Sequence, residues 1–289
     1  MQTPTIALLT SRLRVEEKLI IRALEQRGAN FERVDDGGLV LALGRAEAAP
    51  WDLVWNRSLA FGRTLYGTRA LEARGLTCVN NSHVVEVCGD KARTTLALEE
   101  HGVPTPRTLM AFTPEAALEA AEQLGWPVVI KPVVGSWGRL VARLDSRSAA
   151  EAVLEDRAVL GSWQQQIYYL QEFIEKPGRD LRAFVVGDRC IAAIWRYSEH
   201  WITNTARGGR VEACSVDGEV GELALAAARA VGGGLLAVDL IETPTGLSVL
   251  EVNHSGEFRN SIEPTGVDIP GLMAEWVLEQ VPNRQEVLA

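Results

Sequence analysis

The chain has 289 residues, with 38 acidic against 29 basic side chains and a formal net charge of −9. Its length suits about two domains or one compound fold with a large core, and its acidic balance excludes the basic footprint that nucleic acids or anionic membranes require. The longest uncharged stretch, 158–171, is too short and polar to span a bilayer, and residues 1–14 lack the pattern of a secretory signal. We therefore expect a cytoplasmic protein that binds neither nucleic acid nor membrane.

Short apolar runs alternate with segments of helical period in the first part of the chain. Strands are predicted at 5–9, 39–43, 52–55 and 76–79. Between them, the spacing of Val15, Leu19, Ala23 and Leu24 predicts one helix, and 63–74 predicts another. This alternation favours a small parallel sheet, and we expect residues 1–87 to form the first domain.

A second, smaller α/β unit is expected at 88–170. Its predicted helices and those leading into it are 82–88, 90–101, 114–124 and 146–160, with strands at 128–131 and 140–144. The pattern then becomes rich in strands, predicted at 167–174, 181–186, 190–197, 236–241 and 247–252, with one helix at 219–231. We expect a third domain at 171–283 and a loose tail at 284–289.

Two of the last strands carry acids within apolar runs, Asp239 in LLAVDLIE and Glu251 in LSVLEVNH. If the turn between them has three residues, Thr243 pairs with Leu247, Asp239 lies opposite Glu251, and Asn253 shares their face. Oxygen side chains without sulfur or imidazole suit Mg²⁺, which is typically shared with substrate phosphates. Ion pairs with arginines explain the same spacing, and both interpretations stay open.

Three further segments are candidates for binding a nucleotide. Lys131 ends an apolar strand and is followed by a glycine loop, Gly135–Gly138, whose backbone amides can approach an anion closely. Taken alone, this loop fits a plain hairpin turn better, and no Walker A motif is present. Glu172, Phe173 and Ile174 end the next strand, where exposed backbone groups can hydrogen-bond a purine edge. Asp180 follows and could accept from ribose hydroxyls, although an ordinary strand and turn fits this segment too.

The segment RYSEHWITNTARGGR holds Arg196, Asn204, Arg207 and Arg210 around a glycine pair, which favours binding of carboxylate or phosphate. A flexible hairpin loop is the alternative. The 4 cysteines and 4 histidines have no zinc-site spacing and no arrangement of nucleophile and base.

Taken in order, Lys91, Lys131, the glycine loop, QEFIE and the set Asp239, Glu251 and Asn253 resemble the ATP-grasp ligases. Within them the chain is most similar to the RimK-type branch, and to its ligases that join α-aminoadipate to an amino-group carrier protein in lysine biosynthesis. The stretches that carry this likeness are CGDKARTTLAL, KPVVGSWGRL, EKPGRDLR, HWITNTARGG and EVNHSGEFRNS. The resemblance implies an α/β ATP-grasp fold with a Rossmann-like N-terminal domain, a small central lid domain and a C-terminal α/β domain.

The resemblance also implies a role for each matching residue. ATP phosphates would be held by Lys91, Lys131 and the loop residues Gly135, Ser136, Trp137 and Gly138, adenine by Glu172, Phe173 and Ile174, and ribose by Asp180. Two Mg²⁺ ions would be held by Asp239, Glu251 and Asn253. The transferred phosphoryl group would be steadied by Arg182, Arg196, Asn204 and Arg207. The amino acid would be chosen by Arg259, Asn260 and Ser261, since an Asn-Ser pair at this place accompanies aminoadipate and Gly-Phe accompanies glutamate.

The implied reaction begins with attack of the carrier's C-terminal glutamate carboxylate on the γ-phosphate of ATP. The amino group of α-aminoadipate then attacks the resulting acyl phosphate. The expected partners are thus a small acidic carrier protein and an acidic amino acid, and relatives suggest a homo-oligomer, dimer or tetramer. Three alternatives remain: a glutamate ligase on the same carrier in arginine synthesis, a RimK-type ligase that adds glutamate to a ribosomal protein, and a non-catalytic nucleotide-binding module.

Overall fold

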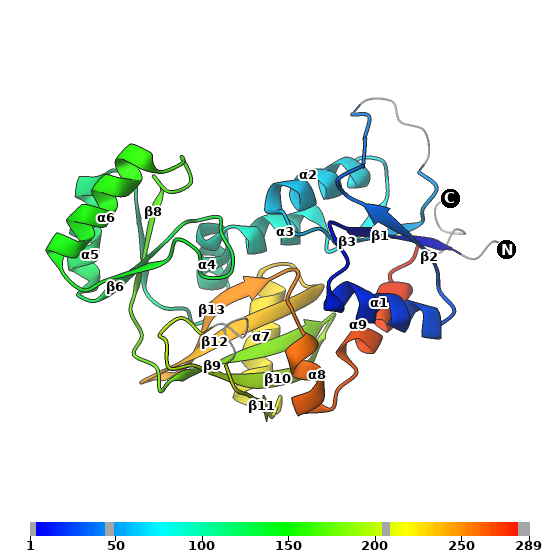
Figure 1. Cartoon of the computed structure of the whole chain (residues 1–289). Coiled ribbons are helices and arrows are strands. Elements are labelled where there is room, and N and C mark those ends of the chain that lie inside the picture. Colours follow the sequence, from blue (N-terminus) through cyan, green and yellow to red (C-terminus); the bar gives the residue numbers. More distant parts are fainter. Residues whose placement is uncertain (1–3, 44–48, 204–208, 283–289) are drawn as a thin grey trace.

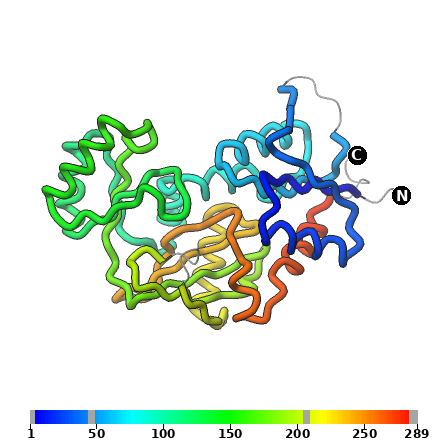
Figure 2. The backbone as a smooth tube through the Cα atoms, viewed as in Figure 1, coloured from blue at the N-terminus to red at the C-terminus, as the bar shows by residue number. Residues whose placement is uncertain are grey.

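The computed structural model describes residues 4–43, 49–203 and 209–282, which form three sheets with their helices (Figure 1). The N-terminal sheet and the central sheet stand at opposite ends of the molecule, and the C-terminal sheet lies between and below them in this view. Figure 2 shows that the last helix returns to the first part of the chain. In the part of the chain described, no helix has the length and apolar character needed to cross a bilayer.

The N-terminal sheet is parallel, as predicted, with the order β2-β1-β3-β4. Its strands are β1 (Thr5–Thr10), β2 (Asn30–Asp35), β3 (Leu53–Arg57) and β4 (Thr77–Val79), and its helices are α1 (Val15–Gln26), α2 (Phe61–Glu72) and α3 (Ser82–Gly89). The strand predicted at 39–43 is wrong, because that apolar run is irregular and only packs Leu39 and Leu41 against the core. The edge strand β2 takes its place. The backbone hydrogen bonds to β1 are enough to hold β2 in the sheet, so its side chains can be mostly polar and exposed.

The central sheet is antiparallel, with the order β5-β8-β6-β7. It consists of β5 (Thr108–Ala111), β6 (Val128–Lys131), β7 (Ala142–Leu144) and β8 (Tyr168–Glu172), covered by α5 (Pro114–Leu124) and α6 (Arg147–Leu160), and is preceded by α4 (Lys91–Glu100). Asp90, Thr113 and Ser146 cap these helices by accepting backbone N–H hydrogen bonds. The domain boundary expected at 170/171 falls inside β8.

The C-terminal sheet is antiparallel, with the order β11-β10-β9-β12-β13. Its strands are β9 (Arg179–Val186), β10 (Arg189–Tyr197), β11 (Val211–Cys214), β12 (Leu235–Thr243) and β13 (Gly246–Asn253). Helix α7 (Glu219–Ala230) covers one face, while α8 (Arg259–Thr265) and α9 (Ile269–Glu279) pack on β10 and β9. Helix α9 also packs on α1, which joins the two ends of the chain.

Because side chains alternate along a strand, the two faces of this sheet make different contacts. Leu181, Ala183 and Val238 point toward α7 and form one core. On the other face, Phe184 and Ala237 share a core with the N-terminal sheet. Farther along the same strands, that face becomes charged and remains open, and this charged half forms one wall of the site.

The hairpin of β12 and β13 reaches the predicted alignment by a different route. Thr243 pairs with Gly246, so the turn is shorter than the three residues we expected. A register shift between the pairs Leu240–Val249 and Asp239–Glu251 then restores the alignment, because Leu250 is an extra residue on its strand. Asp239 therefore lies opposite Glu251, as the sequence predicted.

Candidate functional site

A cleft of about 340 Å³ lies where the three sheets meet. Its walls are the ends of the N-terminal sheet, the glycine loop and the charged half of the C-terminal sheet. Most residues predicted from the sequence line it, namely Lys91, Lys131, Gly135, Ser136, Trp137, Gly138, Glu172, Phe173, Ile174, Asp180, Arg182, Arg196, Asp239, Glu251 and Asn253. A smaller adjoining pocket is lined by Arg259, Asn260 and Ser261 together with Arg182 and Arg196. Asn204 and Arg207 lie outside the described residues.

Strand register aligns charges across the floor of the cleft. Asp239 pairs with Glu251 on one side and with Arg182 on the other. Both Arg182 Nε and Nη2 donate to the Asp239 carboxylate at 2.7 Å, and Arg196 Nη2 lies 3.3 Å from Asp239 Oδ1. Burial would raise the pKa of Asp239, but the two guanidinium groups outweigh it and lower the pKa. The arginine ion pair, one of the two interpretations of the spacing, is thus present for Asp239.

The same acids also suit a hard cation. A bidentate guanidinium occupies one lone pair on each carboxylate oxygen and leaves others free. Asn253 Nδ2 is buried without a hydrogen-bond partner, and a flip of this amide would place its oxygen there instead. Asp239, Glu251 and Asn253 therefore fit Mg²⁺. Within the described ranges no cluster of three or more His, Cys, Asp or Glu could hold a metal ion, so substrate oxygens would complete the coordination.

Two lysines line the other wall of the cleft, and one of them contacts the glycine loop. Lys91, the first residue of α4, donates from Nζ to Gly135 O at 2.7 Å and lies 3.4 Å from Glu251 Oε1. Lys131 Nζ donates to Gln171 Oε1 at 2.6 Å. In the loop, Trp137 and Gly138 have φ of 60° and 65°, and the Trp137 side chain is 45% exposed. The two ammonium groups and this loop form a cationic corner suited to phosphates.

Lys131 gives a pH prediction. Burial lowers the pKa of Lys131 to about 8, and the charges of Lys91 and Lys176 act in the same direction. ATP phosphates should favour the ammonium form, so binding at pH 8 should take up about half a proton. ATP affinity should then fall as pH rises above that value. Calorimetry in two buffers of different ionisation heat measures the uptake, and Lys131→Arg should abolish it. An unchanged uptake in that variant would assign the proton to another group.

The residues predicted to bind adenine and ribose differ in the contacts that their side chains already make within the protein. Glu172 Oε1 accepts from Arg107 N at 2.7 Å, so its carboxylate ties β8 to the segment before β5. Phe173 follows in irregular backbone, with Arg143 over its ring. Asp180 is buried, and its oxygens accept from Arg196 Nε at 2.7 Å and Lys176 Nζ at 3.1 Å. A ribose hydroxyl would therefore have to share this carboxylate with two cations.

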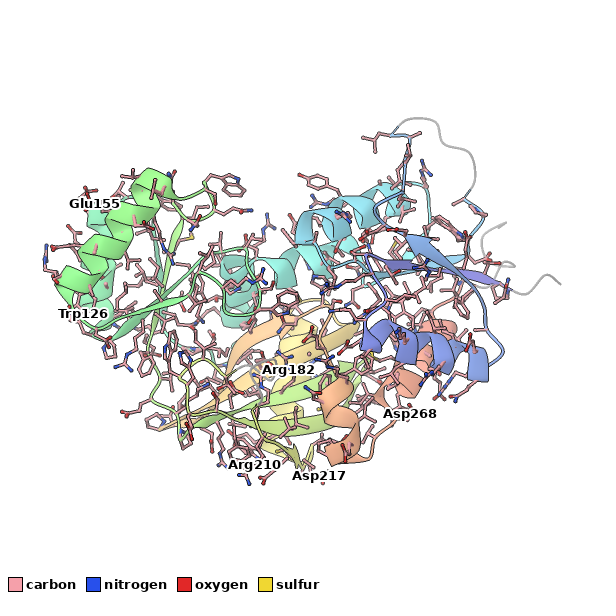
Figure 3. All side chains as sticks on the ribbon, viewed as in Figure 1. Trp126, Glu155, Arg182, Arg210, Asp217 and Asp268 are labelled. Carbon is pink, nitrogen blue, oxygen red and sulfur yellow. The ribbon has the colours of Figure 1, made fainter. Side chains whose placement is uncertain are left out.

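The structure corrects the sequence prediction at Arg210. Figure 3 shows this residue at the lower margin of the molecule, whereas Arg182 lies near the centre. Arg210 Nη1 pairs with Glu212 at 2.8 Å, and its guanidinium lies 4.2 Å from the centre of the Tyr197 ring. Both contacts hold it on the outer side of β10 and β11, away from the cleft lining.

Sequence reasoning missed other residues that line the cleft, among them Arg14, Ser58 and Lys176. Arg14 and Ser58 come from the N-terminal unit, far from the recognised motifs, and nothing in their local sequence distinguishes them. Lys176 is different, since it stands four residues before Asp180 in the segment already considered. A lysine next to a predicted nucleotide-binding strand is a signal that could have been used.

A cleft that combines two lysines, a glycine loop and a facing acidic hairpin, set between an N-terminal parallel sheet and two further sheets, is the architecture of ATP-grasp enzymes. Residues 88–277 match the RimK-like ATP-grasp domain, and residues 6–87 match the LysX preATP-grasp domain. The chain belongs to the RimK-like ATP-grasp family, and it is an ATP-dependent ligase that forms C–N bonds.

Individual relatives cover between 78% and 95% of the chain. The α-aminoadipate–LysW ligase LysX of Saccharolobus solfataricus is 38% identical over 232 residues, 78% of this chain and 84% of the relative. The glutamate–LysW ligase ArgX of Sulfurisphaera tokodaii is 32% identical over 277 residues, 95% of this chain and 98% of the relative. The crystal structure of a RimK domain ATP-grasp protein from Sphaerobacter thermophilus superposes with a TM-score of 0.79 at 29% identity, covering 95% of this chain and 99% of that one.

Proposed function

We propose that this ligase activates the C-terminal glutamate side-chain carboxylate of a small acidic amino-group carrier protein and couples it to the amino group of α-aminoadipate, in lysine biosynthesis. The observation that carries the proposal is the single cleft in which a cationic phosphate corner faces Asp239 and Glu251, with the pocket of Asn260 and Ser261 adjoining it. Relatives named as LysW ligases support the carrier as the partner.

In this proposal the protein acts by position and charge. Lys91, Lys131 and the loop Gly135–Gly138 hold the phosphates of ATP. Asp239, Glu251 and Asn253 would hold Mg²⁺, which when bound would supply positive charge against the transferred phosphoryl group. Arg182 and Arg196 line both the cleft and the adjoining pocket. We propose that both bind the acyl phosphate while the amine attacks it, and the same role is proposed from the sequence for Asn204 and Arg207, which lie outside the described residues.

Water must be kept from the acyl phosphate until the amine arrives. The loop Gly135–Arg139 is a suitable lid, because it stands over the cleft and carries the exposed Trp137. Within the loop, the Arg139 guanidinium lies 5.1 Å from the centre of the Trp137 ring, at the distance of a cation–π contact. Closure of this loop over ATP would exclude water from the reacting groups.

The identity of the acceptor amino acid is proposed from the residues at the start of α8. Ser261 is buried and Asn260 is exposed beside it, and both line the small pocket with Arg259. Arg259 Nε lies 3.9 Å from Glu16 Oε1 of the N-terminal unit, which is a long ion pair. An Asn-Ser pair at this place favours aminoadipate over glutamate, which is one methylene shorter.

We expect the purified ligase to use aminoadipate at least about tenfold better than glutamate in kcat/KM, because one methylene changes binding by a factor of this order. The assay offers ATP, Mg²⁺ and a purified acidic carrier ending in glutamate, with either amino acid, and follows the carrier mass. A peptide from the C-terminus of a ribosomal protein serves as the control acceptor. Preference for glutamate on the carrier would support the arginine-synthesis alternative, and modification of the peptide would support the RimK-type one.

The non-catalytic module considered from the sequence is set aside, because the family consists of ligases.

We propose that the homo-oligomer expected from the superfamily forms in solution, which light scattering would test. We also propose that the central subdomain ends after Glu172, where β8 ends.

A further inference from the structure

We propose that Arg14 and Glu257 form the receptor for the zwitterionic end of the acceptor amino acid, with Arg14 binding the α-carboxylate and Glu257 binding the α-amino group. The inference rests on the proposed function, since it assigns the acceptor's place within that ligase. The sequence assigned no role to either residue, although Glu257 lies in the stretch EVNHSGEFRNS.

Arg14 lies where open parallel sheets form a crevice that binds ligands. In the N-terminal sheet, β2 lies on one side of β1 and β3 on the other, and Figure 1 shows α1 and α2 on opposite faces. Open parallel sheets bind ligands at such a reversal, beyond the carboxyl ends of the strands. Arg14 follows β1 and Ser58 follows β3, and both line the cleft.

The Arg14 guanidinium is held in place before any substrate binds. Nε and Nη2 donate to Glu17 at 2.9 and 2.7 Å, and the Glu17 side chain is buried. Burial opposes the charge of Arg14, but Glu17 outweighs it, so the pKa of Arg14 is raised. Two of the five guanidinium N–H groups are thus used for bracing, and the Nη1 side faces Glu257. A braced fork recognises a carboxylate without having to be ordered first.

Glu257 is the weaker partner of Arg14. Arg14 Nη1 lies 3.3 Å from Glu257 Oε1, against 2.7 Å between Arg14 Nη2 and Glu17 Oε1. A zwitterion inserted between Arg14 and Glu257 replaces each lost charge contact with an equivalent one, so no charge is left unpaired. A neutral or singly charged ligand cannot do this.

The orientation follows from what lies beyond each residue. Glu257 lines the cleft and also the adjoining pocket with Arg182 and Arg196. An amino group at Glu257 therefore faces the site proposed for the acyl phosphate, and the side chain of the amino acid extends toward Asn260. The reverse orientation would place the carboxylate against Glu257 and the amine against Arg14, which like charges exclude.

The segment that carries Glu257 is fixed and has an unused donor. Ser255 Oγ is buried without a hydrogen-bond partner and lines the same cleft, so it is available to the substrate. A Cβ on Gly256 would come within 2.4 Å of Ala237 Cβ, so this segment is pressed against β12. Asn80 Nδ2 also donates to His254 O at 2.9 Å, which ties the segment to the N-terminal unit.

Kinetics of variants test the assignment. Arg14→Met should raise KM for aminoadipate about a hundredfold, with kcat and KM for ATP nearly unchanged. Arg14→Lys should recover only part of the loss, because a lysine lacks the fork. Glu257→Gln should raise the same KM. Arg57 Nη2 also lies 3.3 Å from Glu17 Oε1, so Glu17 should keep a partner in the Arg14 variants. Arg12→Met, an exposed change on the same loop, is the control and should behave as wild type. An unchanged KM in Arg14→Met would overturn the proposal.

A change in the substrate tests it without altering the protein. The α-amide of aminoadipate keeps the amino group and the side-chain carboxylate but lacks the α-carboxylate charge. Wild type should use it about a hundredfold less well, and Arg14→Met should show no further preference for the acid. If wild type ligates both equally, the receptor is wrong and the proposed function stands. If wild type ligates neither aminoadipate nor glutamate to the carrier, the proposed function itself is wrong.

Discussion

Glu251→Gln is expected to lower kcat for ligation about a thousandfold, because a neutral amide binds Mg²⁺ far more weakly than a carboxylate and the transferred phosphoryl group loses its counter-charge. Stability should change little, since the Glu251 side chain is 32% exposed and its ion pair with Lys91 is long, at 3.4 Å. Activity is measured by carrier mass and by ADP release, and folding by thermal unfolding.

The matched control for this variant is Glu242→Gln. Glu242 stands on β12 of the same hairpin and pairs with Arg179 at 2.8 Å, outside the cleft lining. It should keep wild-type activity. If Glu251→Gln retained more than a tenth of wild-type turnover, the assignment of Glu251 to the metal would be refuted.

Asp239→Ala should also abolish activity, but it should in addition destabilise the fold by about 3–5 kcal/mol, because it leaves the largely buried guanidinium of Arg182 without its counter-charge. The side chains of Asp239 and Arg182 are 8% and 16% exposed. Arg196 is also buried, and it keeps Asp180 as its partner. Urea unfolding of Asp239→Ala and Glu251→Ala, side by side, should show a large loss for the first and a small one for the second.

A double variant separates charge burial from packing. Arg182→Met with Asp239→Leu removes both charges and keeps apolar volume, so it should recover most of the stability lost in Asp239→Ala while remaining inactive. Equal stability of Asp239→Ala and wild type would show that the ion pair adds nothing to the fold. Recovery of activity in the double variant would contradict the role of Asp239 as a metal ligand.

Regular elements with strong local signals were predictable from the sequence. Helix α5 and strand β6 match their predicted bounds, because each has a strong local signal. Helix α5 begins with a Thr113 cap and Pro114, and β6 is a run of Val and Ile. Strands β5 and β11 were missed, since each is short and is defined by its partner strand. Helix α8 was not predicted, because it contains Pro264 and a proline within a segment argues against a helix there. Helix α9 was also missed, although its Asp268 cap was a usable signal.

The candidate site divides in the same way. Residues on motif-bearing strands, such as Lys131 and Asp239, were identified from local patterns. Arg14 meets Glu257 across 243 residues of sequence, and such a contact leaves no trace in either local segment. The prediction for Arg210 failed for a related reason, because only its pairing with Glu212 and Tyr197 shows which side of the sheet it occupies.

By itself, the sequence determined which residues carry charge and which of them share a strand face, because side-chain alternation is a local property of the backbone. Only the tertiary structure decided what each charge meets. The pairing of Asp239 with Glu251 was predicted from the sequence, but the bulge at Leu250 that produces it was not. The neighbouring strand supplies Arg182 and the N-terminal sheet supplies Arg14, which the sequence did not indicate. Strand order and register follow from how whole faces bury their apolar surface, and that is a property of the assembled fold. For the same reason, the acidic net charge of the chain did not reveal that lysines and arginines gather in the cleft.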